Sequence, residues 1–302
     1  MIQSPLNYTG GKYKLLPQIL PHFPTEIDTF VDLFCGGCNV GINVSAKKHL
    51  YNDACIPLIN LYKVMQAIEP EKFIEEIELL VKKYDLSDVK THGYDFYNCS
   101  SADGLGSYNR DKYIKMRNDF NAIKEKNANY YIRLYVLIVY AFNNQIRFNR
   151  NGEFNLPPGK RDFNQKMYDK VKNFITELGK QNALFSHCDF RKLDICNLSD
   201  KDFVYADPPY LITCASYNEQ RGWTEQDEKD LLQLLDELNS KKVKFALSNV
   251  LQSKGETNLI LENWISSRLN YRMIDLEYTY NNSSYQRLNK EKKTKEILIM
   301  NY

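Results

Sequence analysis

Two kinds of apolar pattern divide the chain. Short runs rich in β-branched and aromatic residues are typical of buried strands, and they occupy residues 29–34, 49–52, 183–187, 203–206 and 244–248. A helix reaching about residue 47 is expected after the first run. Later helices are predicted at 225–240, where Thr224 and Asp227 form a capping pattern, and at 258–266. Such alternation predicts an α/β fold.

The chain should end in an antiparallel pair. Strands are expected near 271–278 and 296–300, with a polar, lysine-rich loop between them. Five basic residues on or near this loop, Arg287, Lys290, Lys292, Lys293 and Lys295, are offset only by Glu291. They suit contacts with phosphates, although a solvated charged loop explains them equally well.

A different pattern interrupts the α/β alternation. From residue 56 to about 144 strand signals disappear, and helical spacing appears at 70–84, 112–126 and 130–142. A β-hairpin turning at Asn151-Gly152 is then expected over 145–155. The sequence therefore predicts an α/β domain, formed by residues 1–58 and 166–302, that is split by a mainly helical insertion, residues 59–165.

Composition indicates the cellular compartment but does not distinguish between classes of function. The 302 residues carry a formal charge of +2, which leaves local basic patches undecided. Seven scattered cysteines favour reduced thiols and a cytoplasmic location. Cys35 and Cys38 form a lone CxxC without the further ligands that a zinc site needs, so no metal is expected. The first residues do not resemble a signal peptide, and no apolar run is long enough to span a membrane.

The strongest chemical motif is Asp207-Pro208-Pro209-Tyr210, directly after the apolar run 203–206. Prolines cannot extend a strand, so the chain should turn out at the carboxyl end, where α/β sheets bind ligands. A carboxylate, fixed backbone carbonyls and an aromatic ring suit a planar amine, because oxygens accept its N–H bonds and the ring stacks on its face. An ordinary turn at the end of a strand is the alternative.

A second motif follows the first predicted strand. Phe34-Cys35-Gly36-Gly37 would let backbone approach a ligand closely, and Asp53 ends the next strand, where a carboxylate can bind ribose hydroxyls. The full dinucleotide fingerprint is absent, so an adenosine cofactor without phosphates, such as S-adenosylmethionine, fits better. A tight turn beside a surface acid is the alternative.

In combination these motifs resemble one family. The residues 7–12 (Asn-Tyr-Thr-Gly-Gly-Lys), the glycine turn, Asp53, the tetrapeptide at 207–210 and the segment 292–298 keep the order found in the DNA adenine-N6 methyltransferases of the Dam family. The resemblance implies a Rossmann-like class I methyltransferase fold with a target-recognition insertion. It also implies a site-specific enzyme that uses S-adenosylmethionine and no metal to methylate N6 of an adenine flipped out of double-stranded DNA.

The resemblance implies roles for single residues. The catalytic set is Asp207, Pro208, Pro209 and Tyr210. The residues expected to bind the cofactor are Tyr8, Lys12, Phe34, Gly36, Gly37, Asp53, Asp189, Phe190 and Asp207. The residues expected to bind DNA are Arg147, Asn149, Asn155, Lys292 and Lys293. Arg147 falls where relatives carry an arginine that reads guanine, although an ion pair with Glu153 is the structural alternative.

Two departures from the family pattern matter. Cys38 replaces a frequent third glycine, and Gln145 stands where well-known members carry an apolar residue, which puts the recognised sequence in doubt. Methylation of cytosine N4 and an inactive DNA-binding regulator are the alternatives in function. The resemblance further implies a bacterial or phage origin, in a restriction-modification, phage or solitary context, with a cognate restriction endonuclease as a partner in the first case.

Overall fold

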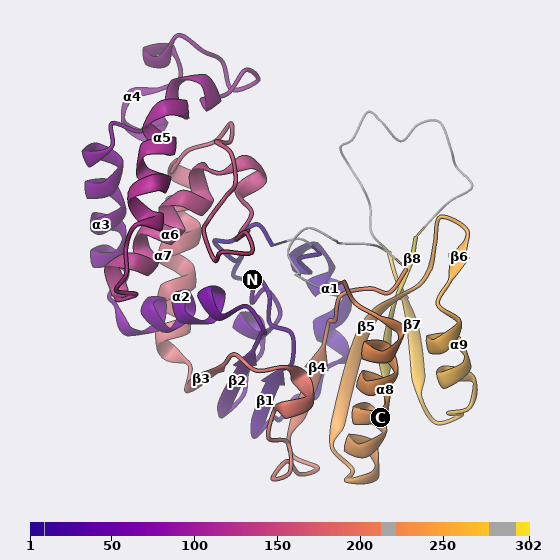
Figure 1. Cartoon of the computed structure of the whole chain (residues 1–302). Helices are drawn as coiled ribbons and strands as arrows, with labels where there is room; N and C mark the ends of the chain where they lie inside the picture. Colours follow the sequence, from indigo (N-terminus) through magenta and orange to yellow (C-terminus); the bar gives the residue numbers. More distant parts are fainter. Residues whose placement is uncertain (9, 213–221, 278–293) are drawn as a thin grey trace. The chain divides into compact units, whose positions relative to one another are not determined.

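The computed structural model describes residues 1–8, 10–212, 222–277 and 294–302. Its contacts divide the chain into two compact units (Figure 1). The sheet unit comprises Lys12–Ala54 and Asn182–Tyr302, and the helical unit comprises Met1–Gly11 and Cys55–Gln181. Helix α7 (Gln165–Lys180) belongs to the helical unit, because it packs on other helices of that unit.

The sheet unit contains a mostly parallel sheet in the order β3-β2-β1-β4-β5-β8-β7. Its strands are β1 (Thr29–Asp32), β2 (Lys48–Asn52), β3 (Ala183–Ser186), β4 (Phe203–Ala206), β5 (Lys244–Ser253), β7 (Arg272–Leu276) and β8 (Lys295–Met300). The short β6 (Glu256–Thr257) pairs with β5. β8 runs antiparallel to both β5 and β7, which confirms the antiparallel end of the sheet.

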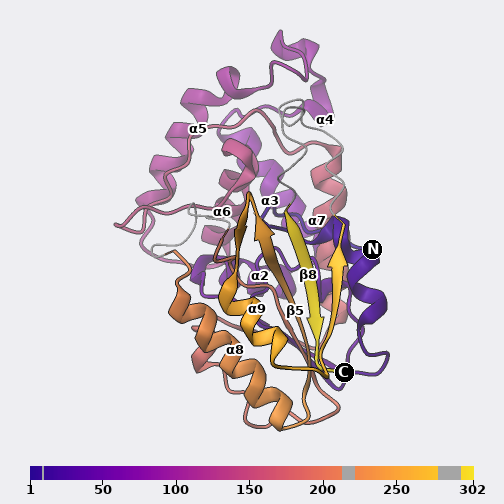
Figure 2. The ribbon, with the colours of Figure 1, turned by 90° about the vertical axis from the view of Figure 1, so that its right-hand side faces the viewer.

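Alternating side chains bury both faces of this sheet. In β4, Val204 packs into one core cluster, whereas Phe203 and Tyr205 pack into the other. Helices α8 (Glu225–Ser240) and α9 (Leu259–Ser266) lie together over the first face (Figure 2). Short helical segments near the start of the unit cover the second: η1 (Tyr13–Leu15), α1 (Leu16–Ile19) and η2 (Leu20–His22).

The prediction of a helix that reaches residue 47 is wrong. After β1 the chain forms a loop with only a short 3-10 segment, η3 (Gly41–Asn43). Gly36 and Cys38 have φ values of 43° and 54°, outside the right-handed helical region. A Cβ on Gly41 would lie 2.3 Å from Tyr51 Cε1, so glycine is needed there too. Close packing of this loop against β2 therefore overrides its helical periodicity.

The helical unit is built on one largely buried helix, α6 (Ala128–Tyr140), where Leu134, Tyr135 and Val136 are 0% exposed. Around it pack α2 (Ile56–Ala67), α3 (Pro70–Lys83) and α5 (Gly106–Asn121), and α7 packs on α2 and α3 (Figure 1). Shorter segments are α4 (Val89–His92), η4 (Asp95–Tyr97) and η5 (Phe142–Asn144). In the sheet unit, η6 (Phe190–Lys192) follows β3.

The predicted hairpin is present in the helical unit as a tight reversal with a single bridge between Phe148 and Phe154. Gly152, at φ 77°, makes the turn, and the Asn149 N–H donates to the carbonyl of Glu153 at 2.8 Å. The Asn121 side chain of α5 bonds both backbone groups of Phe154, at 2.9 and 3.0 Å. The reversal is therefore fixed to α5 by its backbone.

Candidate active site

Most of the predicted catalytic and cofactor-binding residues directly follow the carboxyl ends of four strands in the sheet unit. β1 and β4 are parallel neighbours, with Asp32 opposite Tyr205, and the sheet order reverses between them. In open α/β sheets this reversal is the usual place for a ligand. β1 leads into the glycine turn, β2 into Asp53, β3 into Asp189 and β4 into Asp207. The topology thus brings together motifs that are far apart in the sequence.

A buried ionic cluster lies at the end of β4; we call Lys12, Asp207, Tyr210 and Glu296 the lysine cluster. The Lys12 ammonium lies 2.8 Å from Asp207 Oδ1 and 3.3 Å from Glu296 Oε1. The Tyr210 hydroxyl donates to the same two oxygens, at 2.9 and 3.0 Å. Lys12 Nζ is also 5.0 Å from the centre of the Tyr210 ring, within range of a cation–π interaction.

Burial sets the charges of the lysine cluster. Lys12 is 4% exposed, and burial alone would lower its pKa, but Asp207 and Glu296 together raise that pKa above its ordinary value. The pKa of Asp207 is also raised, chiefly by burial, against the opposing effect of Lys12. Burial raises the pKa of Tyr210 well above its ordinary value, so its hydroxyl remains a donor. The cluster therefore holds a charged lysine beside a carboxylate that accepts a proton readily.

Two members of this region were not predicted as site residues. Glu296 is 13% exposed on β8, and only the pairing of β8 with β5 brings it to Lys12. Its one sequence signal was its place in the closing segment of the family. Asp32 is 2% exposed at the end of β1. Burial, with Asp207 nearby, raises the pKa of Asp32 well above its ordinary value, while the Gly41 N–H opposes that rise.

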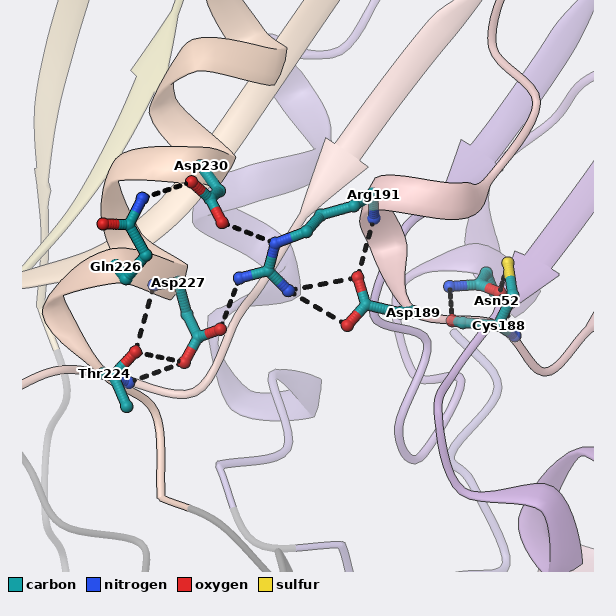
Figure 3. Close-up of polar contacts among 8 residues, drawn as sticks. All are labelled: Asn52, Cys188, Asp189, Arg191, Thr224, Gln226, Asp227 and Asp230. Carbon is teal, nitrogen blue, oxygen red and sulfur yellow. Dashed lines mark hydrogen bonds and ion pairs between the residues drawn. The ribbon is translucent and has the colours of Figure 1, made fainter.

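The glycine turn and Asp53 are in direct contact. The Gly36 N–H donates to Asp53 Oδ2 at 3.0 Å, and Gly37 is buried beside it. Asn52 supports this arrangement by donating to the carbonyl of Leu33 at 3.2 Å. It also donates to the carbonyl of Cys188 at 3.1 Å (Figure 3). One buried amide thus joins the segments that follow β1 and β3.

A third group gathers at the end of β3. The Phe190 ring is 4% exposed and lies 5.4 Å from the ring of Phe34 and 5.7 Å from that of Trp223. Trp223, which was not predicted, is held by a 2.6 Å hydrogen bond from its indole nitrogen to Glu228. Asp189 is exposed and bonds Arg191 (Figure 3). Aromatic faces and a carboxylate therefore adjoin here.

Comparison with known proteins identifies the family. Residues 8–282 match the D12 class N6 adenine-specific DNA methyltransferase family. The chain belongs to this family. It is 41% identical over 307 residues to the modification methylase StsI of Streptococcus sanguinis. It is 40% identical over the same length to the type II methyltransferase M.FokI of Planomicrobium okeanokoites.

These relatives are much longer than the chain. Each alignment covers 100% of this chain but 43% of the relative, so the chain spans less than half their length. The DNA adenine methylase of Escherichia coli is 25% identical over 248 residues, which cover 81% of this chain and 79% of that protein. The resemblance to the Dam family, drawn from the sequence, is therefore confirmed, and with it an adenine rather than a cytosine methyltransferase family.

The donor set fits the cofactor that a methyltransferase family implies. An acid at the end of β2 suits ribose hydroxyls, the glycine turn admits a close ligand, and the rings of Phe34 and Phe190 suit the face of an adenine. Among the described residues, no group of three or more histidine, cysteine or acidic side chains could hold a metal ion. No helix in the described parts of the chain is long and apolar enough to cross a membrane.

The residues expected to bind DNA lie elsewhere. Arg147, Asn149 and Asn155 belong to the hairpin of the helical unit. Arg147 Nε donates to Asn155 Oδ1 at 2.8 Å, whereas Glu153 accepts a bond from Asn149, so Arg147 is held by an amide rather than by the ion pair considered as an alternative. Asn149 also accepts from two backbone N–H groups and so shapes the turn.

Three further expectations have different outcomes. Tyr8 is half-buried in the helical unit, and its carbonyl accepts from the Gly11 N–H at 3.1 Å. Its role beside the cofactor stays a prediction. Lys292 and Lys293 lie outside the described residues, as do Arg287 and Lys290. Lys295, at the start of β8, pairs with Asp275 at 3.2 Å, so this lysine has a partner within the sheet.

Proposed function

We propose that this chain transfers a methyl group from S-adenosylmethionine to N6 of an adenine in double-stranded DNA. The lysine cluster is the observation that carries the proposal, because it fixes one oxygen of the tetrapeptide carboxylate. Among the described residues, both Lys12 and Tyr210 bond Asp207 through Oδ1. Oδ2 is then the oxygen suited to accept a hydrogen from a substrate amine.

The proposed chemistry needs little beyond orientation. Asp207 and the carbonyl of Pro208 would accept the two amine hydrogens, which turns the nitrogen lone pair toward the methyl group. When bound, S-adenosylmethionine supplies that methyl group as an electrophile. As the N–C bond forms, the bond between the methyl group and sulfur would break and leave neutral S-adenosylhomocysteine, so the positive charge passes to the amine, which must lose a proton. Since burial raises its pKa, Asp207 is suited to take that proton.

Tyr210 and the cofactor residues complete the proposal. The Tyr210 hydroxyl bonds Asp207 and Glu296, which fixes the ring that would stack on the flipped adenine. We assign the cofactor's ribose to Asp53 and its methionine part to the turn at Gly36 and Gly37. Its adenine is assigned to Asp189 and Phe190. A cytoplasmic location and a cognate restriction endonuclease stay predictions.

Mapping of methylated bases tests the activity directly. DNA from cells that express the chain should carry N6-methyladenine in one sequence context, and Asp207→Ala should lower the rate about 10²–10³-fold, because it removes an acceptor needed in the transition state. A cooperative thermal unfolding transition of this variant shows that it is folded. N4-methylcytosine would contradict the choice of base, and no methylation by the wild type would favour the inactive regulator.

For DNA recognition we propose the hairpin of the helical unit. Asn155 holds one side of the Arg147 guanidinium, because Nε donates to its Oδ1 at 2.8 Å and one terminal nitrogen donates to its carbonyl at 3.4 Å. The opposite edge of the guanidinium is thereby oriented, and its terminal N–H groups have the geometry that reads O6 and N7 of guanine. Arg147→Ala should cost about 1–3 kcal/mol of discrimination at one base position. Methylation of a library of sites measures this, with Arg150→Ala in the same turn as the matched control. Unchanged preference at every position would leave Arg147 a purely structural role.

A further inference from the structure

One arginine beside the proposed cofactor site, Arg191, contacts three carboxylates, although one would balance its charge. Every nitrogen of the Arg191 guanidinium has a carboxylate partner (Figure 3). Nε donates to Asp230 at 2.6 Å, one terminal nitrogen contacts Asp189 at 3.0 Å, and the other bonds Asp227. We call these four residues the arginine cluster. One positive charge thus faces three negative ones.

On the α8 side the two acids of the arginine cluster are themselves fixed. Asp227 closes the capping box of α8: its Oδ2 accepts from the backbone and hydroxyl of Thr224, at 2.8 and 2.6 Å, and its Oδ1 accepts from Arg191. Asp230 accepts from Gln226 through Oδ1 and from Arg191 through Oδ2. Each acid therefore divides its oxygens between the helix and the arginine, which ties Arg191 to the start of α8.

On the other side Arg191 restricts the turn after β3. Asp189 Oδ1 accepts from the Arg191 backbone N–H at 2.9 Å and from the guanidinium at 3.1 Å, and Oδ2 accepts from the guanidinium at 3.0 Å. The guanidinium also lies 4.4 Å from the centre of the Phe190 ring. One side chain thus contacts both residues of the proposed adenine site.

We propose that Arg191 is a positioning residue that sets how this chain recognises the adenine of its cofactor. The inference rests on the proposed function of Asp189 and Phe190. A carboxylate has about four acceptor positions, and the bonds to Arg191 occupy most of those on Asp189. Among the bonds made by described residues, what remains is one defined direction on Oδ2, which suits a single amine hydrogen. By fixing the carboxylate, Arg191 turns a mobile surface acid into a specific acceptor.

The proposal predicts a preference for an amine over a keto group. Adenine donates through its exocyclic amine, whereas hypoxanthine has an oxygen there, which would face a carboxylate held in place. Without Arg191, Asp189 can rotate away and the repulsion is relieved. The preference for adenine should therefore fall more than the affinity for nucleosides in general.

Calorimetric titration of the full chain with S-adenosylhomocysteine and with its deaminated form, S-inosylhomocysteine, tests this. The wild type should prefer the adenine form by about tenfold or more, as for one charge-assisted hydrogen bond. Arg191→Met should bring this ratio close to unity and raise KM for S-adenosylmethionine, with kcat at saturation nearly unchanged. Arg191→Lys keeps the charge but not the planar geometry, so it should restore thermal stability without restoring the ratio.

Arg268→Met is the matched control. Arg268 pairs with Asp236 on the same helix α8 and lies 4.8 Å from the centre of the Trp264 ring, so it has the same chemistry away from the turn at Asp189. It should lose stability but keep the ratio. An unchanged ratio in Arg191→Met, or its full recovery in Arg191→Lys, would overturn the positioning role. A wild type without preference would instead contradict the assignment of Asp189 in the proposed function.

Discussion

The lysine cluster and the arginine cluster each hold one cation among several acids, yet the pKa values of aspartates in the two clusters shift in opposite directions. Lys12 is 4% exposed, whereas the Arg191 side chain is 34% exposed. The pKa of Asp207 is raised in the first cluster. The pKa values of Asp227 and Asp230 are lowered in the second. Aspartates beside a cation therefore differ in how readily they take up a proton, because the two clusters differ in burial.

Desolvation explains the difference. For Asp207 burial is the largest influence on the pKa, and Lys12 only partly offsets it. For Asp227 burial also raises the pKa, but the bonds from Thr224 and Arg191 together outweigh it. Water screens the more exposed acids, so a hydrogen bond is enough to keep them ionised. A buried cluster can thus hold an acid that takes up a proton more readily than an ordinary aspartate, while an exposed one keeps its acids ionised and serves to fix geometry.

Removing Lys12 should have the largest effect. Lys12→Met would leave Asp207 and Glu296 buried without their cation, and breaking a buried pair costs about 3–5 kcal/mol. Chemical denaturation of the full chain measures the loss in the free energy of unfolding. The double variant with Glu296→Gln should recover part of it, since one of the two stranded charges is gone. Equal losses in the single and double variants would mean that the acids do not depend on Lys12.

Acid should separate the two clusters. A raised pKa means that Asp207 takes up a proton at a higher pH than an ordinary aspartate. As the pH is lowered, kcat should therefore begin to fall before the pH reaches 3.8, the ordinary pKa of an aspartate. A lowered pKa means that Asp227 and Asp230 stay ionised at that pH and lose their charge only below 3.8. Binding of S-adenosylhomocysteine should therefore persist at a pH where kcat has already declined. Parallel loss of both would contradict the contrast.

Neutralising one exposed acid should have the smallest effect. Asp230→Asn removes one of three charges around Arg191, and pairs this close to the surface contribute little because water screens them. Its amide oxygen can still accept from Arg191, so the Asp189 turn should keep its geometry and cofactor affinity should hardly change. Glu296→Gln is the matched substitution in the lysine cluster and should cost more. Thermal unfolding and cofactor titration of both variants make the comparison.

Local signals predicted much of the fold. The run at residues 203–206 became β4, and the helix over 225–240 has the predicted ends and capping box. Those elements are encoded by neighbouring residues, which is why sequence was sufficient. The helix toward residue 47 failed because its periodicity competes with positive φ values and close packing on Tyr51, which neighbouring residues do not reveal.

The sequence by itself determined where the strands begin, to within one residue, together with the tetrapeptide at 207–210, the glycine turn, Asp53 and the membership in a methyltransferase family. Tertiary structure alone decided which charges meet. Glu296 reaches Lys12 because β8 pairs with β5, and Arg191 meets Asp227 and Asp230 because η6 packs on α8. The physical reason is that a pKa depends on burial and on neighbours in space, and neither is fixed by separation along the chain.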